Sequence, residues 1–161
     1  MDFRVEEPQV EELIAGDPRR LVAENARRKA AAVRGQRVLG VDTAVVLDGR
    51  AFGKPRDEAE AETFLRRLSG RTHEVMSGIA VRVGRDERSD VAVTRVRFRR
   101  LEQRDLDWYL ASGEWRERAG GYAIQGRGAA LVDGIDGDYL NVVGLPVAAL
   151  LRLLPDLLHW K

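Results

Sequence analysis

The first periodic pattern along the chain predicts a helix over residues 18–33. Positions on its inner face recur at helical spacing: Leu21, Val22, Asn25, Ala26, Lys29, Ala30 and Val33. Asp17 is a suitable N-cap, and Pro18 suits the first helical position because it needs no amide donor there. Gly35 ends the pattern. An extended, acidic segment over residues 1–12 precedes this helix.

A valine-rich apolar run predicts a buried strand over residues 37–47. The pair Asp48-Gly49 is a hairpin signal, so residues 51–53 are expected to return as a short strand. Two longer strands over 73–83 and 90–99 are expected to pair around a polar turn at 84–87.

The remaining segments mix helices, loops and strands. Helices are predicted over 57–68, 102–112 and 146–154, a glycine-rich loop over 119–128, and strands over 129–133 and 138–143. Hairpins and helical connections together indicate an α/β fold.

Composition limits the classes of protein that this chain can represent. The 161 residues fit a single domain over 1–161, and 44% hydrophobic residues are enough for a core. The net charge of +1 gives no field that favours nucleic acid, and no apolar run is long enough to span a membrane. The chain has no cysteine and only two histidines, which excludes thiolate sites and fits a cytoplasmic protein.

Asp42 is the strongest candidate for chemistry because it interrupts an otherwise apolar strand. A buried carboxylate is costly unless it is paired or binds a metal. A lone aspartate in a strand is more often structural, but Lys54 follows the hairpin that begins after the same strand and can return near it. Such a pair can hold Mg²⁺ and position a water beside phosphate.

Two further charged candidates are ambiguous taken alone. Glu11 and Glu12 can form a second acidic site, but taken alone they are better explained as a solvated surface pair. Lys29 lies among apolar helix positions and can either extend to solvent or face a ligand.

The glycine-rich segment around Gln125 is a candidate for base recognition. Its glycines let the backbone approach a ligand closely, and a glutamine amide offers both a donor and an acceptor to a nucleobase edge. The alternative is a structural turn. The basic stretch from Arg95 to Arg100 alternates like a strand with one solvent face, which favours an exposed charged surface over a nucleic-acid patch.

Several of these motifs, in this order, resemble the Maf family of nucleotide pyrophosphatases, also known as septum formation inhibitors. The resembling segments are ENARRKAAAV (24–33), GVDTAVVLDGRAFGKP (40–55), LRRLSGRTHEVMSGIAV (65–81) and ERAGGYAIQGRGAALVDGIDGDYLNVVGLP (117–146). The resemblance implies a Maf/ITPase-like mixed sheet with flanking helices and two lobes around a cleft. One lobe would hold the Asp42 strand and the acidic segment, and the other the strands at 73–99.

The resemblance also implies an activity: hydrolysis of the α–β anhydride of nucleoside triphosphates to a monophosphate and pyrophosphate, with Mg²⁺ or Mn²⁺. By resemblance, Asp42 activates water and shares the metal with Glu12, and Lys29 and Lys54 neutralise phosphate charge. Thr43 and Gln125 match positions linked to base selection. With glutamine at position 125, the chain resembles the branch of the family that acts on dTTP and UTP. A homodimer is also consistent with the family.

The match departs from the family at the start of the chain. Family members begin with a strand that leads into a Ser-x-Ser-Pro-Arg-Arg loop and a helix, whereas Met1-Asp2-Phe3 matches the segment after that helix. We therefore expect the first strand and the phosphate loop to be missing. A misassigned start is favoured over a shortened protein because the other site residues are present.

Three functions follow as hypotheses. The first is a nucleoside triphosphate pyrophosphatase with a nucleotide-pool cleaning role. The second is a catalytically impaired nucleotide-binding or cell-division regulatory protein, motivated by the missing loop. The third is an RNA-binding module that uses the Arg95–Arg100 strand.

Overall fold

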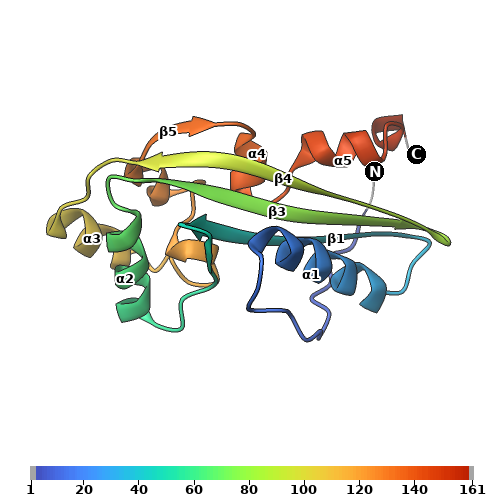
Figure 1. Ribbon diagram of the computed structural model, residues 1–161, viewed down its shortest axis with the longest axis horizontal. Coiled ribbons are helices and arrows are strands. Elements are labelled where there is room, and N and C mark those ends of the chain that lie inside the picture. Colours follow the sequence, from blue (N-terminus) through green and yellow to red (C-terminus); the bar gives the residue numbers. More distant parts are fainter. Residues whose placement is uncertain (1–2, 160–161) are drawn as a thin grey trace.

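The computed structural model describes residues 3–159, in which one five-stranded sheet has the strand order β2-β1-β3-β4-β5 (Figure 1). The strands are β1 (Arg37–Leu47), β2 (Arg50–Phe52), β3 (Thr72–Val83), β4 (Asp86–Phe98) and β5 (Val132–Asp136). The helices are α1 (Pro18–Ala32), α2 (Glu58–Leu68), α3 (Gln103–Leu110), α4 (Tyr139–Val143) and α5 (Val147–Leu153). Short 3-10 turns occupy Ala119–Gly121, Arg127–Leu131 and Leu157–His159.

The α/β class predicted from the sequence is confirmed. In place of the expected mixed sheet, the described strands pair antiparallel throughout. Tight turns connect β1 to β2 and β3 to β4, and a tight turn brings the chain back antiparallel to the strand it has left.

Helix α1 begins and ends close to the predicted residues. The Asp17 carboxylate accepts a hydrogen bond from the Arg20 amide at 3.0 Å, and Pro18 occupies the first turn. The helix then lies almost directly on the sheet. A Cβ atom on Gly40 would lie 2.2 Å from the Ala26 carbonyl oxygen, and one on Gly78 would lie 2.1 Å from that of Val22. Only glycine at these two strand positions allows so close an approach.

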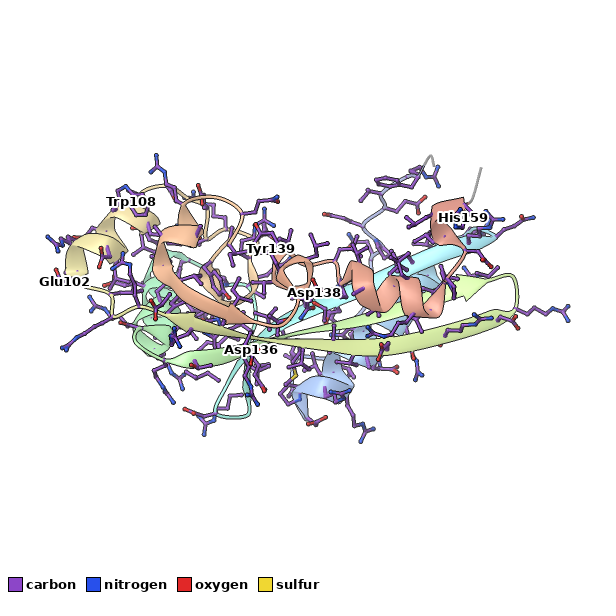
Figure 2. All side chains as sticks on the ribbon, turned by 90° about the horizontal axis from the view of Figure 1, so that it is seen from above. Glu102, Trp108, Asp136, Asp138, Tyr139 and His159 are labelled. Carbon is purple, nitrogen blue, oxygen red and sulfur yellow. The ribbon has the colours of Figure 1, made fainter. Side chains whose placement is uncertain are left out.

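The helices divide the long strands into two halves along their length. At one end α1 covers one face of the sheet and α5 the other, and Figure 2 shows these two helices on opposite sides of the strands. At the other end α2 and α3 pack around Val75, Val96 and Phe98 to form the largest core cluster. The described strands β1 and β3 are paired from Arg37–Val83 to Val46–Glu74. The expected separation of the Asp42 strand from the 73–99 strands into different lobes is therefore wrong.

Two predicted strands near the end of the chain differ from the structure. Residues 138–143 form helix α4, which begins where the Asp138 carboxylate accepts from the Leu140 amide at 2.8 Å and ends at Gly144. Figure 2 labels Asp138 and Tyr139 at the start of this helix. The strand predicted over 129–133 begins only at Val132, because a 3-10 turn holds Arg127–Leu131. Residues Gly134 to Asp136, which lie between the two predicted strands, belong to β5 and pair with β4.

Candidate active site

A cavity of about 620 Å³ lies beside β1, between the two halves of the molecule. Its walls come from the extended segment before α1, from α1, β1 and β2, from the glycine-rich loop and from the end of α4. The six site residues predicted from the sequence all line it: Glu12, Lys29, Asp42, Thr43, Lys54 and Gln125. The fold therefore brings together positions that are up to 113 residues apart in the chain, from Glu12 to Gln125.

The edge of β1 explains how one cavity can contact both faces of the sheet. Strand β2 pairs with β1 only at Val45–Leu47, so no described strand covers this edge before Val45. Successive side chains of a strand point to opposite faces. Asp42 therefore faces α1, while Thr43 faces the other side and shares a hydrogen bond of 2.8 Å with the Ser77 hydroxyl.

The charged centre of the cavity is Lys29, whose ammonium group lies between two carboxylates. Its Nζ atom is 2.6 Å from Asp42 Oδ1 and 2.8 Å from Glu12 Oε1. Burial lowers the pKa of Lys29, but hydrogen bonds to Asp42 and Glu12 outweigh burial, so the pKa is raised above its usual range. The lysine is therefore a fixed positive charge at neutral pH. The Asp42 side chain is 11% exposed and that of Glu12 is 46% exposed, so Glu12 forms the open side of this cluster.

Asn25 completes the cluster, and sequence reasoning did not assign it a function. Its Nδ2 atom donates to Asp42 Oδ2 at 3.0 Å and to the Leu13 carbonyl oxygen at 3.0 Å, and its Oδ1 atom accepts from the Leu13 amide at 2.7 Å. The available signal was a polar side chain on the apolar face of the predicted helix, four residues before Lys29.

Lys54 lies on the rim of the cavity, where its ammonium group is 2.8 Å from the Glu117 carboxylate. The hydrogen bond to Lys54 lowers the pKa of Glu117. Both side chains are well exposed, so this pair can open to a ligand at little cost. Lys54 and Asp42 line one cavity, and the described ion pair of Lys54 is with Glu117, so the closeness of Lys54 to Asp42 stays a prediction.

The glycine-rich loop that carries Gln125 is fixed from the core side. The buried Tyr109 hydroxyl accepts a hydrogen bond from the Ala123 amide at 2.9 Å. The Tyr122 hydroxyl lies 2.8 Å from Nε2 of the buried His73. Tyr109 therefore holds the loop by its backbone and Tyr122 anchors it by a side chain, while Gln125 lies at the cavity wall.

The donor set suits a hard divalent cation. Glu12 and Asp42 already converge on one positive charge, and Mg²⁺ in nucleotide sites commonly uses one or two carboxylates together with phosphate oxygens. In the part of the chain that the structure describes, no group of three or more acidic or histidine side chains could hold a metal by itself. A metal at this site would therefore take its remaining oxygen ligands from water or from the substrate.

The basic strand that was considered as a nucleic-acid patch carries ion pairs instead. Arg97 contacts Asp133 at 2.7 Å, and Arg99 contacts Asp105 at 2.8 Å. Such pairing is typical of an exposed charged sheet face. Among the described helices, none is long and apolar enough to cross a membrane.

In an α/β protein, a cavity that combines lysines, two carboxylates and a glutamine is suited to a small phosphorylated ligand. A family model described as Maf-like protein matches residues 1–157, and the chain belongs to this family.

Curated relatives of the chain carry one name. A dTTP/UTP pyrophosphatase of Symbiobacterium thermophilum is 48% identical over 158 residues, covering 94% of this chain and 81% of that protein. One of Thermus thermophilus is 45% identical over 153 residues, covering 94% and 82%. One of Dictyoglomus thermophilum is 42% identical over 163 residues, covering 96% and 84%.

Proposed function

We propose that this protein is a nucleoside triphosphate pyrophosphatase that converts dTTP and UTP to the monophosphate and pyrophosphate. The observation that carries the proposal is the convergence of Glu12, Lys29 and Asp42 in the cavity whose wall includes Gln125. The relatives named dTTP/UTP pyrophosphatase support the choice of nucleotide. The expected role is the removal of unwanted pyrimidine nucleotides in the cytoplasm. The expected oligomeric state is a homodimer.

In the proposed reaction, a water oxygen bonds to one phosphorus of the α–β anhydride. The bond from that phosphorus to the bridging oxygen breaks, and the Asp42 carboxylate takes the proton from the water. Lys29 and Lys54 balance the charge that develops on the phosphate oxygens, and electrostatic stabilisation of this kind is a major part of phosphoryl-transfer catalysis. Lys29 reaches the phosphates from the Asp42 side of the cavity and Lys54 from the rim.

Glu12 and Asp42 would hold a divalent cation, Mg²⁺ or Mn²⁺. The cation would supply charge neutralisation at the phosphate oxygens. Gln125 and Thr43 line the cavity and would select the base, Gln125 through its amide.

The experiment is to measure pyrophosphate release from dTTP, UTP, dATP and GTP with Mg²⁺, in the wild type and in Asp42→Asn. Loss of a general base lowers the rate by roughly 100-fold to 10,000-fold. We therefore expect Asp42→Asn to lower kcat by at least about 100-fold, with dTTP and UTP as the preferred wild-type substrates.

Asp48→Asn is the matched control, because Asp48 follows the same strand but pairs with Arg71 outside the cavity. Its kcat should stay within about twofold of the wild type. Unchanged turnover in a folded Asp42→Asn protein contradicts the role of Asp42. Binding of UTP without pyrophosphate release by the wild type favours the non-catalytic alternative.

A further inference from the structure

Asn25 occupies an unusual position on α1. It is 1% exposed, although the surrounding buried residues of this helix are apolar or proline. Asn25 and Lys29 are one helical turn apart, so both side chains point from the same face towards β1. Burying an amide is costly unless its donors and acceptor are hydrogen-bonded. The partners of the Asn25 amide therefore indicate the role of this residue.

Asn25 makes three hydrogen bonds, in which both N–H groups of its amide donate and its oxygen accepts. The partners are Leu13 and Asp42. The amide pairs with both backbone groups of Leu13, as a neighbouring strand would, and gives its remaining N–H to Asp42. Only one orientation of the amide satisfies these bonds. A flipped amide would turn Oδ1 towards the Asp42 carboxylate and the Leu13 carbonyl, which are both acceptors.

On the Asp42 side, this contact fixes the plane of the carboxylate. Oδ2 is bound to Asn25 and Oδ1 to Lys29, so rotation of the carboxylate would break two hydrogen bonds. The neutral amide donates without adding a charge that competes with a cation.

On the other side, the same amide fixes the segment that bears Glu12. This segment has no helix or strand assignment between Phe3 and Leu13. Its position near α1 depends on the bonds of Leu13 to Asn25, of the Glu11 carbonyl to Arg28 and of Glu12 to Lys29. Since Leu13 directly follows Glu12, the Asn25 amide sets how far the Glu12 carboxylate lies from that of Asp42.

We infer that Asn25 is the positioning residue that holds the Glu12 and Asp42 carboxylates at the spacing needed for one divalent cation. This inference rests on the proposed function, in which the two carboxylates share that cation. Residues that orient metal ligands typically change metal affinity or activity by about 10-fold to 100-fold when they are replaced.

The test compares Asn25→Ala with Asn141→Ala. Asn141 is also a buried asparagine with two Nδ2 hydrogen bonds, to the Val75 carbonyl and the Thr94 hydroxyl, but it has no described contact with either carboxylate. Three quantities are measured for each protein: Tm, the Mn²⁺ dissociation constant by electron paramagnetic resonance, and kcat and KM for dTTP. Mn²⁺ binding is measured both without nucleotide and with a dUTP analogue that has a methylene group in the α–β bridge.

Asn25→Ala should weaken Mn²⁺ binding and lower kcat by about tenfold or more, with KM for dTTP changed by less than about threefold. Asn141→Ala should lower Tm while Mn²⁺ affinity stays at the wild-type value. Asn25→Leu, which keeps about the size of the side chain but removes both N–H donors without adding a charge, should weaken Mn²⁺ binding as well and serves if the alanine variant does not fold.

Wild-type Mn²⁺ affinity in folded Asn25→Ala or Asn25→Leu overturns the inference. Equal losses of Mn²⁺ affinity in Asn25→Ala and Asn141→Ala at equal Tm also overturn it, because they indicate a general effect of lost stability. Mn²⁺ binding needs no turnover. A wild type that binds Mn²⁺ but releases no pyrophosphate therefore refutes the proposed function separately.

Discussion

Acidification from pH 7 to pH 5 should destabilise this protein mainly through His73. The imidazole is 2% exposed, its Nε2 atom bonds the Tyr122 hydroxyl, and its Nδ1 atom is buried without a hydrogen-bond partner in the described residues. Burial lowers the pKa of His73 from 6.5 to about 4. A proton on Nδ1 would have to remain unpaired in the core, which explains the direction of the shift.

The sign and size of the change in the free energy of unfolding follow from proton linkage. The unfolded chain binds the histidine proton near pH 6.5 and the folded protein only near pH 4, so stability is present above pH 6.5 and is lost as the pH falls towards 4. For this pair of pKa values, the loss in the free energy of unfolding is about 2 kcal/mol between pH 7 and pH 5. It approaches about 3 kcal/mol at pH 4.

Urea denaturation at pH 7, 6 and 5 measures this loss in the wild type, His73→Gln and His159→Gln. The His73→Gln protein should be less stable at pH 7 but should lose much less stability on acidification. His159 is exposed, so His159→Gln should follow the wild-type curve. An equal loss in His73→Gln and the wild type would refute the reasoning and place the pH dependence on the carboxylates.

Two further predictions concern the supports of the site. Gly78→Ala should lower the free energy of unfolding, measured by urea denaturation, by about 2 kcal/mol or more, because the new Cβ would lie 2.1 Å from the Val22 carbonyl oxygen. The control is Gly53→Ala, whose Cβ would have no neighbouring atom within 4 Å and which should be nearly neutral in the same assay. Tyr109→Phe leaves the Ala123 amide without its acceptor, so we expect the free energy of unfolding to fall by about 1–3 kcal/mol and KM for dTTP to rise. If both the KM and the stability are unchanged, the hydroxyl does not hold the loop.

The sequence predicted the elements whose pattern is long. Strand β1 has the predicted bounds, and α1 begins at the predicted Pro18 because cap and periodicity agree. Helix α4 was predicted as a strand because a five-residue run with Val142 and Val143 is too short for periodicity to distinguish the two. Its state depends on the local Asp138 cap, which the sequence analysis did not use, and on the buried bonds of Asn141, which only the tertiary structure provides.

The candidate site was predictable where residue type and family resemblance agreed. Asp42 was notable as a charge within an apolar strand, and the structure places Glu12, Lys29 and Gln125 around the same cavity. The links between these residues were not predictable, because Asn25 reads locally as one more helix position and its partners are 12 and 17 residues away in the chain. Likewise, no local pattern around Lys54 indicates its pairing with Glu117, 63 residues later.

The close seating of α1 on Gly40 and Gly78 has a consequence for how the site tolerates change. The helix packs on the strands through main-chain atoms, so the distance between the backbones that carry Lys29 and Asp42 is set by this contact and by the two glycines that allow it. Substitutions among the surrounding apolar side chains can therefore accumulate without altering that separation. The arrangement of the candidate site therefore depends in part on this backbone contact, whereas Glu12 and the Lys54–Glu117 pair are its more exposed parts.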